Sequence, residues 1–373
     1  MIRSLLGIAR RSSSAWLAAL CLLSPATNFA EKLSLAEALA LAERQNPLLR
    51  VGEAALEGAR AGMLSARAYP NPGVSSQTGR QTVRLPGNVP GFVQVFSFSQ
   101  PLELGALRPS RLALAERTVD AAAVQLNARR LGVLSNVRRT FYEVLRRQGE
   151  IGILEENLRL VEEFRRRIQI RVEVGEAARL ELVRAEAELA TARAQLNSAR
   201  LHLIGALAAF RAAVGANLPQ TLAVEGRLDP PAPLPPLSDI EQEVLSRQPL
   251  LRLARAEIRR AEARLAYEEA QRRPQPSLRT DFERYPDVPN FRFGIDLPLP
   301  LWNRREGPIA EAVAASRQAQ AQEAAQRVEL LAAAEGAYRR YQAAGEQVLA
   351  FETGVIREAE AALSAAQTAY QLG

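Results

Sequence analysis

The sequence has 373 residues, a formal net charge of +7 and an aromatic content of only 5%. Alanine, leucine, arginine and glutamate dominate, which is typical of long helices rather than of a mixed globular domain. Lys32 is the only lysine, and arginines dispersed among glutamates indicate paired charges on helix faces rather than a nucleic-acid patch.

Residues 1–30 have the pattern of a secretory signal peptide, with a basic start and a short apolar run over residues 15–23. Small residues at Ala26 and Ala30 offer cleavage points. The run is too short for a transmembrane helix, which needs about 20 residues. Cys21, the only cysteine, lies inside this segment, so no disulfide is expected in the mature chain.

The rest of the chain is an incomplete duplication. Ser34 and Glu37 have the spacing of a helix-capping box, and Ser238 and Glu241 repeat it. The motif Asn46-Pro47-Leu48-Leu49-Arg50 returns as Gln248-Pro249-Leu250-Leu251-Arg252. In both halves a helix follows and stops at a Pro-x-Pro, because proline lacks the amide donor that a helix needs. These prolines are Pro70 and Pro72, then Pro274 and Pro276.

Each half then predicts a pair of β-strands. In the first half Phe92, Gln94, Phe96 and Phe98 share one face, opposite Val93, Val95, Ser97 and Ser99, and the partner strand lies near Val74–Thr82. In the second half Leu278, Thr280 and Phe282 alternate with Arg279, Asp281 and Glu283; Phe291, Phe293, Ile295 and Leu297 alternate with Arg292, Gly294 and Asp296. This period-two alternation predicts two hairpins, each with one apolar and one polar face.

Very long helices follow the hairpins. Pro109 and Pro308 suit the first turn of a helix, and no proline occurs from Ser110 to Leu218. We expect a signal peptide at 1–30, a first repeat at 31–218, a proline-rich linker at 219–237 and a second repeat at 238–373. Within the first repeat the strands span about 73–102, the long helix about 109–174 and the return helix about 177–213.

Helices of this length must pack side by side. A coiled-coil scaffold would do so, but the hairpins argue against it. A sheet between lipid and a wet lumen needs alternating faces and strands of about 9–11 residues. Four strands cannot close a barrel, so strands that span a membrane would require several copies of the chain. Trp302 suits a membrane–water interface or, equally, an ordinary buried indole.

This order of elements resembles the TolC-type outer membrane efflux proteins, and within them the CzcC-like, heavy-metal-resistance branch. The strongest segment is Val174-Gly175-Glu176-Ala177-Ala178-Arg179-Leu180-Glu181-Leu182-Val183-Arg184-Ala185-Glu186-Ala187-Glu188-Leu189, which looks like the family's periplasmic turn and return helix. The paired residues Pro101-Leu102 and Pro300-Leu301 match its strand exits. The family often has aspartate where Glu181 stands.

The resemblance implies a mainly α fold with two β-hairpins, in which long antiparallel helical hairpins are combined with four strands per chain. It implies a homotrimer that forms a twelve-stranded barrel in outer-membrane lipid and a helical tunnel across the periplasm. Such a protein is a passive exit duct, which works with a periplasmic adaptor and an inner-membrane pump, of the resistance-nodulation-division type in this branch. Val174, Gly175, Glu176 and Ala177 would form the tip that meets the adaptor.

The second repeat departs from this pattern, because Ala369–Gly373 matches the register of Arg171–Gly175 and the sequence stops there. No second return helix follows, so no residue inherits that helix's acidic gate positions. We expect a truncated sequence, and poor assembly of this chain by itself.

No residues point to catalysis, to a cofactor or to a bound metal. The sequence lacks a phosphate-binding loop, a dinucleotide fingerprint and a G-x-S-x-G motif. Its only histidine, His202, lies in the predicted return helix, with no Cys/His cluster around it. The alternative to the duct is a periplasmic adaptor or a coiled-coil scaffold of a transport complex. An adaptor would have one helical hairpin between small β-domains, whereas this sequence predicts two strand pairs in duplicated order.

Overall fold

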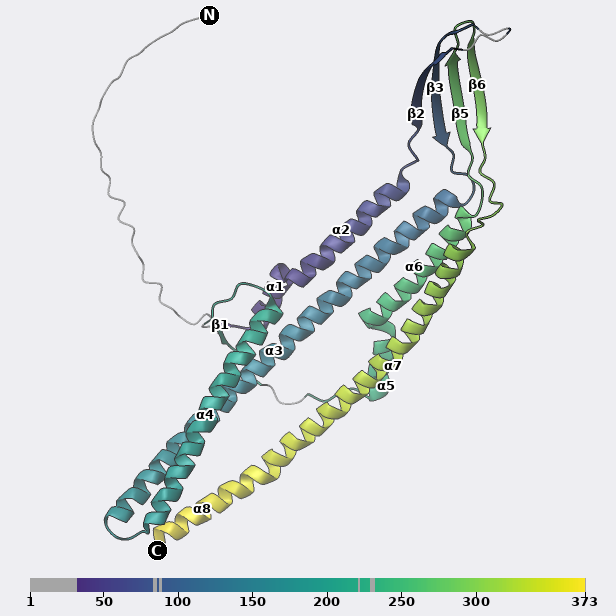
Figure 1. Cartoon of the computed structure of the whole chain (residues 1–373). Helices are drawn as coiled ribbons and strands as arrows, with labels where there is room; N and C mark the ends of the chain where they lie inside the picture. Colours follow the sequence, from purple (N-terminus) through teal and green to yellow (C-terminus); the bar gives the residue numbers. More distant parts are fainter. Residues whose placement is uncertain (1–31, 83–85, 87–88, 221, 229–231, 373) are drawn as a thin grey trace, which may run out of the picture.

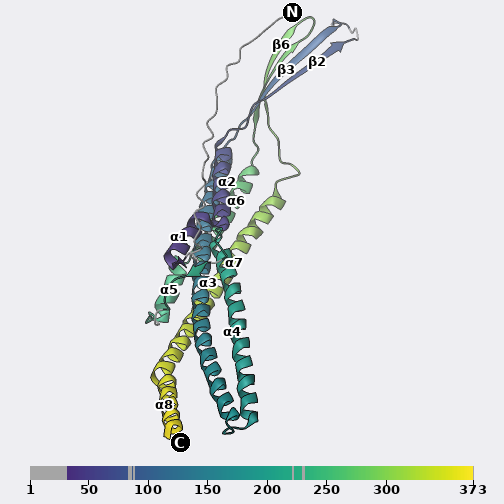
Figure 2. The ribbon, with the colours of Figure 1, turned by 90° about the vertical axis from the view of Figure 1, so that its left-hand side faces the viewer.

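The computed structural model describes residues 32–82, 86, 89–220, 222–228 and 232–372. The predicted signal peptide at 1–30 and the final Gly373 lie outside the described residues. The molecule is elongated, with a β-sheet at one end and the turn between two long helices at the other (Figures 1 and 2). This is the predicted fold class, mainly α with two β-hairpins.

The elements follow the duplicated order. In the first half they are α1 (Leu35–Gln45), α2 (Pro47–Arg67), β2 (Gly73–Gln81), β3 (Gly91–Pro101), α3 (Leu107–Glu173) and α4 (Arg179–Val214). In the second half they are α5 (Leu237–Arg247), α6 (Pro249–Gln271), β5 (Ser277–Arg284), β6 (Pro289–Asp296), α7 (Glu306–Ala350), a π-helical turn (Phe351–Val355) and α8 (Ile356–Leu372). The two-residue strands β1 (Lys32–Leu33) and β4 (Ala223–Val224) pair in parallel, which the sequence did not predict.

The two hairpins join into one antiparallel sheet with strand order β2-β3-β5-β6. The register places Ser76, Phe96, Phe282 and Phe291 in one row across the four strands. A neighbouring row on the opposite face contains Ser97, Asp281 and Arg292. The sheet therefore has an apolar face and a polar face, and its two edge strands, β2 and β6, each have one side without a partner among the described residues.

The helical core lies where α1, α3 and α4 meet. Val137, Phe141, Val144, Phe210 and Val214 are almost fully buried there, and the rings of Phe141 and Phe210 pack edge to face with centroids 5.9 Å apart. Each such side chain contributes about 1.5–3 kcal/mol by burial. In the second half α5 packs on α7 and buries none of its own residues.

Asn46 is the polar residue that holds this core together. It is only 2% exposed, and its side-chain oxygen accepts a hydrogen bond from the Leu48 amide at 2.9 Å and so caps α2. Its Nδ2 donates to the carbonyls of Ala213 and Val214, at 2.9 and 3.1 Å, at the end of α4. One side chain thus satisfies both the start of one helix and the end of another. The corresponding Gln248 makes no capping bond.

One predicted helix start is correct and the other is wrong. Ser34 and Glu37 form a complete capping box at α1. Ser238 and Glu241 do not, because α5 begins at Leu237, directly after the extended Pro236, and this leaves Ser238 inside the first turn. Its hydroxyl instead donates to the Asp239 carboxylate at 3.2 Å.

Trp302 is 95% exposed, so the interpretation as an ordinary buried indole is wrong. The helices give no membrane signal of their own: throughout the part of the chain that the structure describes, none combines the length and the apolar character needed to cross a bilayer.

The duplication provides a matched pair of variants for Asn46. Asn46→Ala should lower the free energy of unfolding by about 1–3 kcal/mol, because it removes a helix cap and leaves two buried carbonyls unpaired. Gln248→Ala should change it by less than about 0.5 kcal/mol, since no capping bond is lost. Denaturant unfolding in detergent, followed by circular dichroism, measures both. Equal effects of the two variants would contradict the role given to Asn46.

Candidate functional site

The turn between α3 and α4 is built by a glycine-dependent helix ending. α3 ends at Glu173, and Gly175 has a φ of +82°, in the left-handed region that favours glycine. The Glu176 amide donates to the Arg171 carbonyl at 2.8 Å, and the Gly175 amide donates to the Val172 carbonyl at 3.1 Å. These two bonds define a Schellman motif, which ends the long helix sharply and lets the chain reverse.

The predicted tip residues come together at this turn. Val174, Gly175 and Glu176 are exposed and Ala177 is half-buried. Three further apolar side chains near the turn, Ile170, Leu180 and Val183, are also exposed. Sequence reasoning missed these three, although apolar residues beside a glycine turn in otherwise polar helices were a usable signal. The tip is therefore an apolar surface at the end of a charged hairpin.

Ion pairs connect the two arms of the hairpin behind the tip. Arg165 pairs with Glu186 at 3.1 Å, Arg193 with Glu162 at 3.0 Å and Arg200 with Glu155 at 2.9 Å. Between these pairs the small residues Ala185, Ala192 and Ala199 are buried on α4, which brings the helices close together. Each exposed ion pair contributes only about 0.2–1 kcal/mol to stability, so the main effect of these pairs is to fix the register between α3 and α4.

Other charges pair within α3. Hydrogen bonds and attraction from Arg146 and Arg147 lower the pKa of Glu143 to about 2, against the cost of partial burial. The pKa of Glu156 is lowered by Arg159. Both carboxylates are therefore ionised at neutral pH, and the helix surface carries compensated charge.

The polar face of the sheet carries its own ion pairs. Arg279 pairs with Asp281 at 3.0 Å, and Arg292 pairs with Glu283 at 2.8 Å. The opposite face exposes Phe291, Phe293 and Ile295. A water-filled lumen suits the first face and hydrocarbon suits the second.

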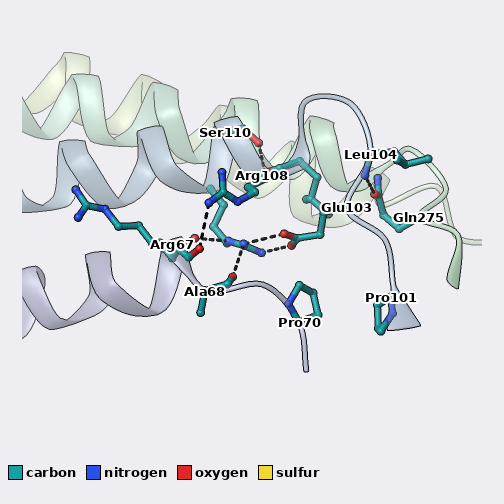
Figure 3. Close-up of polar contacts among 12 residues, drawn as sticks. Arg67, Ala68, Pro70, Pro101, Glu103, Leu104, Arg108, Ser110 and Gln275 are labelled. Carbon is teal, nitrogen blue, oxygen red and sulfur yellow. Dashed lines mark hydrogen bonds and ion pairs between the residues drawn. The ribbon is translucent and has the colours of Figure 1, made fainter. Parts of the chain in front are cut away.

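A partly exposed arginine near the start of α3, Arg111, holds the sheet to the helices in the first half. Figure 3 shows Glu103, which follows β3, and Arg108, at the start of α3, beside the end of α2. Arg111 donates to the carbonyls of Ala66 and Ala68, both at 3.0 Å, and forms a two-pronged pair with the Glu103 carboxylate. Arg108 adds a bond to the Arg67 carbonyl at 3.2 Å. Carbonyls that the end of a helix would leave unpaired thus become the anchor of the junction.

The described residues offer little to a resident metal ion. Within the ranges that the structure covers, no three His, Cys, Asp or Glu side chains come together as a cation-binding group. His202 lies exposed on α4.

Comparison with known proteins agrees with this architecture. Residues 38–216 match the sequence family described as Outer membrane efflux protein. This part of the chain is an outer membrane efflux protein domain. The resemblance to the TolC-type efflux proteins and their metal-resistance branch is confirmed. The matched family and the matched channels are described as outer-membrane proteins.

Two relatives of this chain are metal-resistance proteins. It is 26% identical over 345 residues to the cobalt-zinc-cadmium resistance protein CzcC of Cupriavidus metallidurans, covering 91% of this chain and 80% of CzcC. It is 25% identical over 277 residues to the nickel-cobalt-cadmium resistance protein NccC of Alcaligenes xylosoxydans, covering 74% of this chain and 62% of NccC.

Solved channels share the fold. The outer membrane protein VceC of Vibrio cholerae superposes with a TM-score of 0.74 at 20% identity, covering 91% of this chain and 86% of VceC. CusC superposes with a TM-score of 0.73 at 18% identity, covering 91% of this chain and 82% of CusC.

The tip turn can be tested with two glycines of the same helix system. Gly175→Ala should destabilise the protein by about 1 kcal/mol or more, because a side chain is disfavoured at positive φ. Gly152→Ala, on an exposed face within α3 where an added Cβ meets nothing, should stabilise it by up to about 1 kcal/mol. Denaturant unfolding measures both. Destabilisation of similar size at both positions would contradict the special role of Gly175.

Proposed function

We propose that this protein is the outer-membrane exit duct of a tripartite efflux system, through which an inner-membrane pump expels its cargo. The observation that carries the proposal is an amphipathic sheet with an exposed apolar face, set at the opposite end of the molecule from the α3–α4 turn (Figure 1). α3 has 67 residues, and at ~1.5 Å per residue it spans roughly 100 Å. Such a molecule can join a membrane to a distant partner, and this role needs no catalytic group.

Closure of the sheet requires further copies of the chain. The edges of β2 and β6 present backbone donors and acceptors, which cannot be left unpaired in hydrocarbon. TolC-type channels are homotrimers. Three copies with four strands each would close a barrel without an open edge.

The duplication predicts the register of that closure. β6 corresponds to β3, as Pro300 corresponds to Pro101, and β2 corresponds to β5, as Pro70 corresponds to Pro274. Ser97 of β3 lies opposite Asp281 of β5 within the chain. The equivalent contact between copies places Asp296 opposite Gln77 of a neighbouring copy, with both on the polar face.

Disulfide cross-linking tests this closure. The double variant Gln77→Cys/Asp296→Cys, made in a Cys21→Ser background, should yield covalent dimers and trimers on oxidation, because directly opposed strand residues have Cα atoms about 4.5–5.5 Å apart, within disulfide reach. Denaturing electrophoresis without reductant measures the products.

Two kinds of control accompany it. Thr78→Cys/Asp296→Cys places the thiols on opposite faces of the sheet and should cross-link poorly, and each single-cysteine chain should give no trimer. If Asp296→Cys instead cross-links with Ser75→Cys or Gly79→Cys, the register between copies differs from the predicted one by two residues. No cross-link with any of the three positions would contradict the shared barrel.

We also propose the partners at the other end. Val174, Gly175, Glu176 and Ala177 would contact a periplasmic adaptor, supported by their exposure at the hairpin turn and by the apolar surface around them. The pump would be of the resistance-nodulation-division type. Divalent transition metals are the proposed cargo, because CzcC and NccC are cobalt-zinc-cadmium and nickel-cobalt-cadmium resistance proteins.

Metal susceptibility tests the cargo and the tip together. Deleting the gene from its native host should lower the minimum inhibitory concentration of zinc, cobalt, nickel or cadmium, and the wild-type gene should restore it. Glu176→Arg should restore resistance poorly, because it reverses a charge at the adaptor contact, whereas Glu188→Arg, an equally exposed change away from the turn, should restore it fully. If deletion leaves metal susceptibility unchanged, the proposal that these metals are the cargo is wrong. If Glu176→Arg restores resistance fully, the proposed contact between the tip and the adaptor is wrong.

A further inference from the structure

The passage from β6 to α7 carries an unusually exposed apolar segment. Leu299 and Leu301 are exposed, and Trp302 is 95% exposed. Leaving a whole indole in water forgoes a large gain, since burial of aromatic surface is favourable. No described residue covers it, so the segment needs a partner outside the chain.

The first half uses the same position differently. Counting from the matched prolines Pro101 and Pro300, Trp302 corresponds to Glu103. The Glu103 side chain is 6% exposed and pairs with Arg111, so it is part of the junction between sheet and helices. The tryptophan in the second half is therefore not a remnant of that contact.

The second half anchors its junction with other residues. Arg305 donates to the Glu268 carboxylate, whose side chain is only 1% exposed, and Arg264 pairs with the same carboxylate at 2.6 Å. Because Arg305 and Glu268 form the ion pair here, position 302 is not needed for the junction. The change of pairing frees the side chain at this position to point outward.

The turn that presents Trp302 is itself specified. The Leu301 amide donates to the Leu299 carbonyl at 2.9 Å, and the Arg305 amide donates to the Asn303 side chain at 2.9 Å. Arg305 has a φ of +59°, which a non-glycine residue adopts only under local constraint. Trp302 thus lies between two fixed points, strand β6 and the Arg305–Glu268 pair.

The segment continues the apolar face of the sheet. Phe291, Phe293 and Ile295 alternate along β6 and are exposed, and Leu299 and Leu301 beyond its end are exposed as well. Trp302 lies where this apolar column gives way to the helices, and a cation, Arg304, follows two residues later. Tryptophan prefers this depth of a bilayer, where the ring is apolar and the indole N–H meets headgroups.

We propose that Trp302, with Leu299, Leu301 and Arg304, is an interfacial anchor for phospholipid on the periplasmic side of the outer membrane, present once per copy. The inference rests on the proposed duct function, which places the apolar face of the sheet in lipid. The ring lies at the boundary between headgroups and acyl chains, and Arg304 faces the lipid phosphate. The anchor fixes how deep the sheet lies in the membrane.

Tryptophan fluorescence provides a direct test, because the chain has only one other tryptophan, Trp16. The full chain with Trp16→Phe is reconstituted into phosphatidylcholine vesicles with bromine high or deep on the acyl chains. Trp302 should emit to the blue of free tryptophan and lose more fluorescence to the shallow bromines than to the deep ones. Water-like emission without quenching would overturn the anchor. A blue-shifted emission without quenching would also overturn it and would indicate cover by a neighbouring copy.

A second variant separates this outcome from failure of the duct. Trp16→Phe/Trp302→Phe/Phe293→Trp places the only tryptophan on the apolar face of β6, where the deep bromines should quench it more strongly. If this probe is quenched and Trp302 is not, the anchor alone is wrong. If neither is quenched, the sheet does not lie in lipid and the proposed duct fails as well.

Discussion

The rest of the structure depends on the requirement that backbone amides and carbonyls of a sheet in lipid be paired. A four-stranded sheet with an apolar face leaves two edges that hydrocarbon cannot solvate. In the proposed duct the chain meets this requirement by sharing its sheet with other copies, so assembly would be a condition of membrane insertion. The long helices of those copies would then also lie side by side around a common axis.

The sequence was most informative where the signal is local. Alternation in Phe92–Phe98 and Phe291–Leu297 predicted the two faces of the sheet, and Pro-x-Pro and Gly175 predicted where helices end. The pairing of β3 with β5 was not predicted, since it joins residues nearly two hundred positions apart. The pairs of Arg111 with Glu103 and of Arg305 with Glu268 were missed for the same reason: they depend on which helix end each arginine reaches.

The long helix shows why periodicity fails on some elements. α3 contacts α2 and α6 along one part of its length and α1 and α4 along another. Different sides of α3 are therefore buried in its two parts, and no single apolar stripe runs from Leu107 to Glu173. The second predicted capping box does not form for a different reason. Pro236 is the residue before α5, so Ser238 lies inside the first turn of the helix and cannot cap it.

The junction at Arg111 has a mechanical consequence. α3 spans roughly 100 Å at ~1.5 Å per residue, and ion pairs to α4 brace its outer part, so a sideways push at the tip acts on the sheet with the leverage of the whole of α3. That load reaches the sheet through two junctions, the bonds from Arg111 to the end of α2 and the ion pair of Arg305 with Glu268. A partner that grips the tip therefore loads these few side chains before it loads the strands beyond them.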